Sequence, residues 1–255
     1  MSPEAALVPG RFDGRTVIVT GAGSGIGKAT ALRLAREGAT VVATDVVESR
    51  LTELVEENPG LTFVTVPGDI SAQEVVDRVV AGAGGRVDGL ANVAGIMDAF
   101  LPPAEVDDET WERVLRINLT APMRTTRAVL PLMLAAGKGA IVNVSSEASL
   151  RASASGVAYT ASKHAVNGLT KATAVFYKGD GVRCNAVAPG AVATNIEAPF
   201  HSAHAGAVLG PFMQAMVTSV AQPDELAALI TWLLSDDASN VNGAVIPCDG
   251  GWSAI

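Results

Sequence analysis

Cysteine is scarce in this chain, and the two that are present, Cys184 and Cys248, stand far apart without a metal-binding spacing. This scarcity excludes a disulfide framework and predicts reduced, buried thiols, as in a cytoplasmic protein. Histidine is also rare. His201-x-x-His204 could place two imidazoles on one helical face, but no third ligand follows at a suitable spacing, so we expect no metal site.

Basic residues are outnumbered by acidic ones, 18 against 26, and form no Lys/Arg-rich run. The formal charge of −8 disfavours a nucleic-acid surface and acidic substrates. Charged residues make up only 17% of the chain and hydrophobic residues 49%, which excludes a disordered protein. No uncharged window reaches membrane-spanning length, and the first 14 residues lack the basic start and apolar stretch of a secretory signal. We therefore expect a cytoplasmic protein that contacts neither nucleic acid nor membrane.

Short β-branched runs alternate with longer helical stretches, which indicates βαβ units on a parallel sheet. Several runs are apolar on successive residues, as is typical of strands covered by helices on both faces. We therefore predict an α/β fold with a doubly wound, seven-stranded parallel sheet. The predicted strands are Thr16–Thr20, Thr40–Thr44, Thr62–Val66, Gly89–Val93, Ala140–Val144, Arg183–Ala188 and Ala244–Pro247.

Helix start signals fit this alternation. Ser71 and Glu74 have the spacing of a capping box, and Pro223-Asp224-Glu225 places acidic side chains in a first turn. The long stretch Asp107–Ala136 contains Pro122, which removes a ladder donor, so we expect a local kink there. The predicted helices begin near Gly25, Ser71, Asp107, Ser155 and Pro223.

Residues 191–222 depart from the alternation. They join a strand to a helix over some thirty residues and carry large apolar side chains such as Phe200, Phe212 and Met216. Loops of this length in compact domains are usually functional lids or contain short helices. The apolar side chains could line a hydrophobic substrate pocket or pack the lid on the body. Because no repeat or linker interrupts the chain, we predict one domain over residues 1–255 with a substrate lid at 191–222.

A glycine-rich turn, Thr20-Gly21-Ala22-Gly23-Ser24-Gly25-Ile26-Gly27, follows the first predicted strand and leads into a helix. Glycines at such a turn let the backbone approach a pyrophosphate, to which the helix N-terminus offers N–H groups and partial positive charge. The spacing is G-x-x-x-G-x-G rather than the general G-x-G-x-x-G, and a purely structural turn is the alternative. The strand before and the helix after it favour nucleotide binding.

Asp45, at the end of the second predicted strand, indicates which dinucleotide the turn would bind. A carboxylate there can accept both hydroxyl protons of an adenosine ribose and would repel a 2′-phosphate. This favours NAD over NADP. A turn-capping aspartate is the alternative, and nearby Arg50 keeps NADP open.

Tyr159 and Lys163 lie four residues apart in a predicted helix, so they share one face. A free tyrosine has a pKa near about 10, and it can act as a base at neutral pH only if a nearby cation stabilises the phenolate. An exposed Tyr/Lys pair is the alternative. Ser145 and Ser146 follow a predicted strand, where the carboxyl ends of parallel strands line a ligand crevice and a hydroxyl can orient a substrate carbonyl.

Together these motifs resemble those of the single-domain, NAD(P)-dependent short-chain dehydrogenases/reductases. The resemblance extends from about Gly14 to Trp252. It implies a Rossmann-like fold and a homotetramer whose contacts come from the helix faces around 107–136 and 158–178 and from the tail. The matching elements, in family order, are Thr20-Gly-x-x-x-Gly25-x-Gly27, Asp69, Asn92-Val93-Ala94-Gly95, Asn118, Ser146, Tyr159-x-x-x-Lys163 and Pro189-Gly190.

The resemblance implies four catalytic roles. Tyr159 would exchange a proton with the substrate oxygen while hydride passes to or from the nicotinamide. Lys163 would hold the nicotinamide ribose and lower the pKa of the tyrosine. Ser146 would hydrogen-bond the substrate oxygen, and Asn118 would support a water-mediated proton path from the lysine.

The resemblance also implies a set of cofactor contacts. Asp69 and Ile70 would flank the adenine, Asn92 and Gly95 would shape the cofactor floor, and Thr194 would contact the nicotinamide end. The full predicted set is Gly21, Ser24, Gly25, Ile26, Gly27, Asp45, Asp69, Ile70, Asn92, Ala94, Gly95, Tyr159, Lys163, Pro189, Gly190, Val192 and Thr194.

The sequence leaves three points open. Asn92 and Asn118 could instead satisfy buried backbone groups. Val93 stands where the family has a second asparagine, so any side-chain contact from that residue is lost. Ser145 beside Ser146 leaves two candidate hydroxyls, of which the spacing to Tyr159 favours Ser146.

These features predict an NAD-dependent oxidoreductase that interconverts a hydrophobic secondary alcohol, such as a hydroxysteroid, and its ketone. A 3-oxoacyl-thioester reductase is an alternative, but Asp45 and the acidic composition count against its usual NADPH and acidic carrier. A non-catalytic NAD-binding regulator is the third hypothesis. The presence of Ser146, Tyr159 and Lys163 counts against it.

Overall fold

The computed structural model describes residues 7–196, 199–217 and 219–254. These residues form a seven-stranded sheet in the order β3-β2-β1-β4-β5-β6-β7, and every neighbouring pair is parallel. The predicted doubly wound sheet is therefore confirmed. The strands are β1 Thr16–Thr20, β2 Thr40–Thr44, β3 Phe63–Thr65, β4 Gly89–Asn92, β5 Gly139–Val144, β6 Val182–Pro189 and β7 Val245–Cys248.

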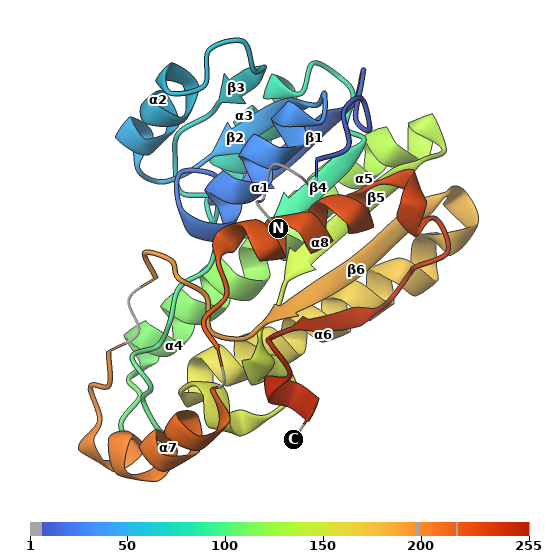
Figure 1. Ribbon diagram of the computed structural model, residues 1–255. Helices are drawn as coiled ribbons and strands as arrows, with labels where there is room; N and C mark the ends of the chain where they lie inside the picture. Colours follow the sequence, from blue (N-terminus) through green and yellow to red (C-terminus); the bar gives the residue numbers. More distant parts are fainter. Residues whose placement is uncertain (1–6, 197–198, 218, 255) are drawn as a thin grey trace.

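Helices cover both faces of the sheet (Figure 1). Successive side chains of a strand point to opposite faces, so Val17 and Val19 pack with α1, α2 and α8 while Ile18 packs with α3, α5 and α6. Two separate hydrophobic clusters result, which is why the strands are apolar on consecutive residues. The helices are α1 Gly25–Arg36, α2 Glu48–Glu56, α3 Gln73–Gly82, α4 Asp108–Leu115, α5 Ala121–Ala136, α6 Val157–Tyr177, α7 Ala203–Met216 and α8 Pro223–Leu234.

Two helix predictions need correction. The capping box at Ser71 and Glu74 is wrong, because α3 begins at Gln73 and has no side-chain cap. Ser71 instead accepts a hydrogen bond from Arg116, 3.0 Å away, so a tertiary contact replaces the local one. Helix α2 was not among the predicted helices. The acidic first turn of α8 is confirmed, and Glu225 completes a capping box there with Gln222.

The stretch predicted to kink at Pro122 is interrupted by a π-helical segment, η2, over Arg116–Thr120. Ala121 donates to the carbonyl of Arg116, five residues back, and Pro122 then occupies the first turn of α5. A missing N–H is harmless in a first turn, so the wider turn accommodates the proline without a broken helix. The segment also places Asn118 in the interior, 1% exposed.

Helix α7 and its flanking segments lie beyond the carboxyl ends of the strands, apart from the sheet (Figure 1). A bridge between Val192 and Ala221 joins the two ends of this excursion. The long loop therefore contains a helix of its own, as its length indicated. In the described part of the chain, no helix is long and apolar enough to cross a membrane.

Candidate active site

The glycine-rich turn between β1 and α1 has the shape of a pyrophosphate cradle. Gly21 and Gly25 have φ angles of 67° and 50°, a left-handed conformation that favours glycine. A Cβ on Gly27 would overlap the carbonyl oxygen of Gly21, so the helix packs directly on the turn. Ser24 forms no side-chain cap, which leaves the first N–H groups of α1 available to an anion. The turn therefore fits a dinucleotide phosphate.

Asp45 lies directly beside this turn and is 8% exposed. Its carboxylate accepts hydrogen bonds from the main-chain N–H of Gly23 and of Val47, each at 3.0 Å. A Cβ on Gly23 would lie 2.9 Å from the carboxyl carbon of Asp45 and 2.8 Å from Cβ of Arg50. The end of β2 thus places a carboxylate beside the glycine-rich turn. The same carboxylate also hydrogen-bonds the loop that follows β2.

The loop after β4 forms the other side of the turn. The Thr20 hydroxyl accepts a hydrogen bond of 3.1 Å from the N–H of Ala94, and a Cβ on Gly21 would lie 3.0 Å from Cα of Ala94. A Cβ on Gly25 would lie 3.0 Å from the side chain of Thr194. Ala94 and Thr194, from the predicted cofactor set, therefore both adjoin the glycine-rich turn.

Asn118 links the cofactor side of the site to α6. Its Oδ1 accepts from the N–H of Ile96 and its Nδ2 donates to the carbonyl of the same residue, both at 2.9 Å. Nδ2 also lies 3.2 Å from the hydroxyl of Ser162. A Cβ on Gly95 would lie 3.3 Å from Asn118 Oδ1 and 3.5 Å from Lys163 Nζ, so a glycine keeps this space open.

Tyr159, Lys163 and Ser146 come together at the carboxyl end of β5. Tyr159 is 9% exposed and Lys163 3%. Lys163 Nζ donates to the carbonyl of Val144 at 2.8 Å and lies 5.4 Å from the centre of the Tyr159 ring. The hydroxyl of Ser146 interacts with the phenol and lowers its pKa. A phenol, an alcohol and an amine are thus gathered in one buried site.

The family is established by comparison with known proteins. The family model "short chain dehydrogenase" matches residues 15–205. A short-chain dehydrogenase/reductase of Penicillium canescens, olcF, is 39% identical over 260 residues, covering 96% of this chain and 99% of that protein. This chain is a short-chain dehydrogenase/reductase. It is an enzyme of the class that acts on CH–OH groups.

Two further relatives of this short-chain dehydrogenase/reductase have informative names. The 3beta-hydroxysteroid dehydrogenase 2 of Eggerthella lenta is 41% identical over 254 residues, covering 94% of this chain and 95% of that protein. The crystal structure of levodione reductase is 35% identical, with a TM-score of 0.85 and coverage of 95% of this chain and 99% of that one.

Another solved structure bears on the cofactor. A candidate NAD(P)-dependent gluconate 5-dehydrogenase from Beutenbergia cavernae is 38% identical, with a TM-score of 0.85. The alignment covers 97% of this chain and all of that one, which was crystallised with NADP at low occupancy. The family therefore binds a nicotinamide dinucleotide, and the choice between NAD and NADP rests on this chain's own residues.

The pKa of Tyr159 in this dehydrogenase is shifted in the direction opposite to the one expected. Burial raises the pKa of Tyr159 to about 12, against a lowering by the Ser146 hydroxyl, and the Asp98 carboxylate raises it further. Burial lowers the pKa of Lys163 to about 8. In the chain alone, desolvation thus outweighs the expected lowering of the tyrosine's pKa by the lysine.

The two adjacent serines have distinct partners. Ser145 donates to Oδ1 of Asn167 at 2.7 Å and to the carbonyl of Lys163 at 3.3 Å, so its hydroxyl holds β5 against α6. Ser146 accepts from the N–H of Ala148 at 3.1 Å and contacts the phenol. The geometry agrees with the assignment of Ser146 as the hydroxyl that faces substrate.

Asn92 was predicted to shape the cofactor floor, but its side chain is buried and hydrogen-bonded within the interior. It donates to Asn143 at 2.9 Å and accepts from the hydroxyl of Thr125 at 2.7 Å. Asn143 in turn donates to the hydroxyl of Thr170 at 2.9 Å. This buried chain of hydrogen bonds joins β4 and β5 to α5 and α6, which favours the alternative that Asn92 satisfies buried polar groups.

The remaining predicted contacts lie at strand ends. Asp69 accepts from the N–H of Ser71 at 2.9 Å, and Ile70 beside it is 6% exposed. After Pro189, which ends β6, a Cβ on Gly190 would lie 2.9 Å from Cα of Asp249, so this glycine lets the C-terminal segment pack closely.

Sequence reasoning missed Asp98, which is fully buried beside α6. Its carboxylate accepts from the N–H of Gly156 at 3.1 Å and of Tyr159 at 2.9 Å. Gly156 is the N-cap residue of α6 and has no side chain to cap with. The sequence offered no local signal, because the helix was predicted to begin near Ser155, and the capping carboxylate is 58 residues away from Gly156.

Proposed function

We propose that this enzyme uses NAD to interconvert a hydrophobic secondary alcohol and its ketone. The observation that carries the proposal is the buried group of Ser146, Tyr159 and Lys163 at the carboxyl end of β5, beside the glycine-rich turn. Ligands of open parallel sheets bind at this end. The group contains a hydrogen-bond donor for the substrate oxygen, a proton partner and a cation.

The roles follow from the chemistry of each group. Ser146 orients the substrate oxygen, and Tyr159 exchanges a proton with it. Lys163 holds the ribose hydroxyls of the cofactor, with Asn118 supporting proton passage behind it. Bound NAD supplies the hydride acceptor and a positive ring charge. Since Tyr159 has a pKa of about 12 in the chain alone, positive charge close to the phenol is needed before it acts as a base near neutral pH.

The choice of NAD rests on Asp45. A carboxylate that accepts from the Gly23 N–H lies beside the phosphate cradle, where an adenosine ribose would sit. A 2′-phosphate there would meet like charge. The side chain of Arg50 begins beside the same glycine and is a cation that favours NADP, which is why both cofactors belong in the test.

A hydrophobic ring alcohol is the substrate class that we propose. Two of the relatives are named for a hydroxysteroid and for levodione. The segment over the site, which we propose as the substrate lid of a single domain, carries exposed apolar side chains at Ile196, Phe200 and Phe212. Apolar residues in that segment suit a ring substrate better than a polyol such as gluconate.

We also propose that the enzyme is a cytoplasmic homotetramer. Cys184 and Cys248 are both free thiols, as expected in a reducing compartment. An apolar hollow of about 390 Å³ between α5 and α6 contains Leu134 and Phe176, and Phe176 is 77% exposed. An exposed apolar surface on two long helices suits an interface between subunits.

The test is reduced-nicotinamide absorbance over time with NAD or NADP and a panel of alcohols. The panel contains hydroxysteroids, cyclic hydroxyketones, gluconate and a 3-hydroxyacyl thioester. We expect turnover of a ring alcohol with NAD that disappears in Tyr159→Phe, and a shift toward NADP in Asp45→Ser. A wild-type preference for NADP would overturn the role of Asp45. Tight NAD binding without turnover of any substrate would favour a cofactor-binding regulator.

A further inference from the structure

The buried carboxylate of Asp98 binds three N–H groups. Besides those of Gly156 and Tyr159, its Oδ1 accepts from the N–H of Phe100 at 3.2 Å. A Cβ on Gly156 would lie 2.5 Å from both the Asp98 carboxylate and the N–H nitrogen of Leu101, so the loop and the helix start are in tight contact. Asp98 therefore caps the helix that carries Tyr159, although it belongs to a different segment.

The two residues that follow Asp98 are strained. Ala99 and Phe100 have φ angles of 55° and 57°, in the left-handed region that residues with side chains rarely adopt. Such a conformation persists only where the surroundings hold it. On one side, Val157 at the start of α6 donates to the carbonyl of Leu101 at 3.0 Å.

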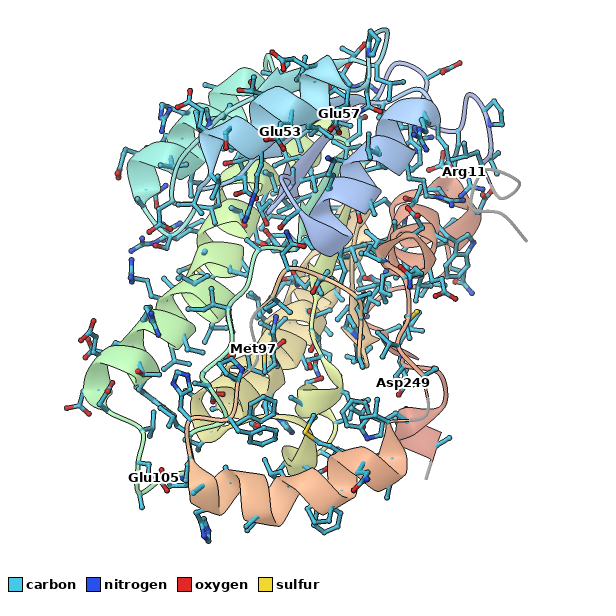
Figure 2. All side chains as sticks on the ribbon, turned by 60° about the vertical axis from the view of Figure 1, so that its left-hand side comes forward. Arg11, Glu53, Glu57, Met97, Glu105 and Asp249 are labelled. Carbon is cyan, nitrogen blue, oxygen red and sulfur yellow. The ribbon has the colours of Figure 1, made fainter. Side chains whose placement is uncertain are left out.

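On the other side, the segment leading into α7 holds this strained pair. The N–H of His201 donates to the carbonyl of Ala99 at 3.2 Å. The ring of Phe200 stacks on Phe100, with centroids 4.2 Å apart and planes inclined by 23°. Ser202 donates to Glu105 at 2.9 Å, and Glu105 lies beside one end of α7 (Figure 2).

We propose that Asp98 is a positioning residue that couples the lid to Tyr159. The stack and the His201 bond hold Ala99 and Phe100 in their left-handed conformation. That conformation directs the Asp98 carboxylate at the start of α6 and so sets the place and surroundings of the phenol. The proposal rests on the proposed function only in that Tyr159 is the proton partner of the substrate.

The coupling has an electrostatic readout. The Ser146 hydroxyl lowers the pKa of the phenol and the Asp98 carboxylate raises it, and the Lys163 amine lies 5.4 Å from the centre of the ring. Asp98 raises the pKa of Tyr159, as does burial. Loss of the carboxylate, or its displacement when the lid contact is broken, lowers that pKa. Removal of the charge in Asp98→Asn lowers the pKa whatever else Asp98 does, so a shift in a lid variant, with the carboxylate still present, is the readout specific to the coupling.

The sequence allows a direct measurement, because it contains only two tyrosines. Replacing the other one, Tyr177→Phe, leaves Tyr159 as the sole phenol, whose ionisation is followed by NMR of ¹³C-labelled tyrosine during a pH titration. We expect the midpoint to fall in Asp98→Asn, because a negative charge that disfavours the phenolate is removed. It falls in the same direction in Phe200→Ala, and it stays unchanged in Phe212→Ala, a matched loss of an exposed ring on α7.

An unchanged midpoint in Phe200→Ala overturns the coupling, even if Asp98→Asn shifts it. An unchanged midpoint in both variants overturns the role of Asp98 as well. If Asp98→Asn does not fold, Phe200→Ala still decides, because Phe200 is 41% exposed and is not itself a core side chain. The titration needs no turnover, so failure of the proposed substrate class is distinguishable from failure of the coupling.

A kinetic measurement separates coupling from simple contact with substrate. If Phe200 only lines the pocket, Phe200→Ala raises KM and leaves kcat and its pH profile unchanged. If the coupling holds, Phe200→Ala lowers kcat and moves the limb of the kcat profile that reports Tyr159, and Phe200→Leu, which cannot stack, behaves like Phe200→Ala. A change in KM alone contradicts the proposal.

Discussion

At the scale of single residues, the two adjacent serine hydroxyls of Ser145 and Ser146 have different roles. Ser146 ends the turn out of β5, with its Oγ toward the phenol of Tyr159. Ser145, one position earlier, is 2% exposed and bonds Asn167 on α6. Successive residues at a strand end point in opposite directions, so one serine meets the ligand crevice and its neighbour meets the helix layer.

This difference predicts separable effects of two alanine substitutions. Ser146→Ala should lower kcat/KM by about 100-fold, because it removes a donor to the developing charge on the substrate oxygen, and should cost about 1 kcal/mol through loss of the cap to the Ala148 N–H. Ser145→Ala should leave kcat/KM near the wild-type value and cost about 1 kcal/mol of stability. Steady-state kinetics and urea unfolding of both variants provide the check. Equal losses of activity would contradict the assignment.

At the scale of elements, a glycine in α1 and a glycine in α6 have opposite effects on stability. In α1, Gly27 lets the helix pack against the carbonyl of Gly21, and this close approach shapes the turn that we propose binds the cofactor phosphates. In α6, Gly168 is exposed and its Cβ would meet nothing within 4 Å. The first glycine is required by packing, whereas the second only weakens its helix.

Alanine at these two positions should therefore change stability in opposite directions. Gly27→Ala should cost about 2 kcal/mol or more and weaken NAD binding, because the turn must move away from the helix. Gly168→Ala should add about 0.5–1 kcal/mol through helix propensity. Denaturant unfolding and a cofactor titration measure both effects. A Gly27→Ala variant as stable as wild type would show that the turn relaxes freely.

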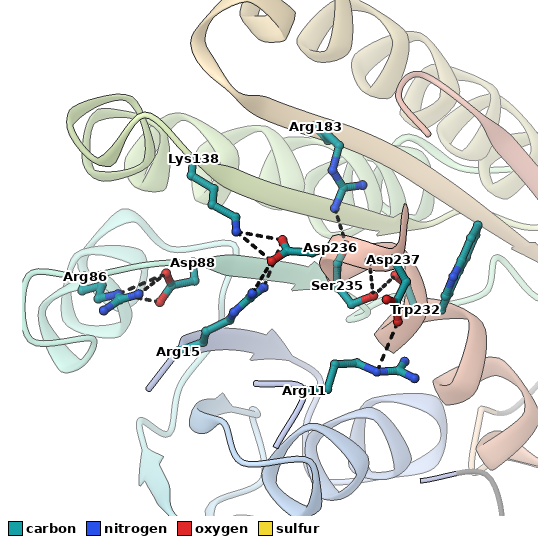
Figure 3. A network of polar contacts seen from close by, with 10 residues as sticks. All are labelled: Arg11, Arg15, Arg86, Asp88, Lys138, Arg183, Trp232, Ser235, Asp236 and Asp237. Carbon is teal, nitrogen blue, oxygen red and sulfur yellow. Dashed lines mark hydrogen bonds and ion pairs between the residues drawn. The ribbon is translucent and has the colours of Figure 1, made fainter. Parts of the chain in front are cut away.

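At the scale of the whole molecule, an ion cluster joins distant parts of the chain at the amino ends of the strands. Asp236, just after α8, binds Arg15 at 2.5 Å and Lys138 at 2.8 Å (Figure 3). Arg15 precedes β1 and Lys138 precedes β5. These hydrogen bonds, first from Arg15 and then from Lys138, lower the pKa of Asp236 to about 2.

The cluster predicts an acid-dependent loss of stability. Because the folded pKa of Asp236 is below the unfolded value of about 3.9, its contribution is present at neutral pH and is lost as the pH falls from about 4 to 2. Asp236 is 54% exposed, so Asp236→Asn should cost only about 1 kcal/mol or less at pH 7. Urea unfolding at several pH values checks this. A difference from wild type that persists at pH 2, or resists added salt, would contradict the electrostatic cause.

The proposed homotetramer predicts the effect of a charge on the α5/α6 surface. Phe176→Asp should yield smaller species in sedimentation, because a buried carboxylate without a partner is costly at an apolar interface. Phe212→Asp, on α7, is the matched control and should leave the assembly unchanged. A wild-type chain that sediments as a monomer would remove the proposal, as would a Phe176→Asp variant that still forms tetramers.

Much of the fold follows from patterns that are local in the sequence. The apolar runs predict the strands, since a strand covered on both faces must be apolar on successive residues. The glycine-rich turn and the Tyr159–Lys163 pair are also local, because a strand-to-helix turn and one helical turn determine their geometry. The seven strands and the site at their carboxyl ends could therefore be predicted without coordinates.

The tertiary structure decided the features whose partners lie far apart in sequence. Ser71 lost its predicted capping role to Arg116, 45 residues away, and the side chain of Asn92 is committed to Asn143 and Thr125. Asp98 caps a helix from a separate segment, and burial, rather than spacing, is the largest influence on the pKa values of Tyr159 and Lys163. Sequence periodicity specifies which face of an element is buried. It does not specify which polar group of another element will face a given side chain, because that depends on how the layers pack.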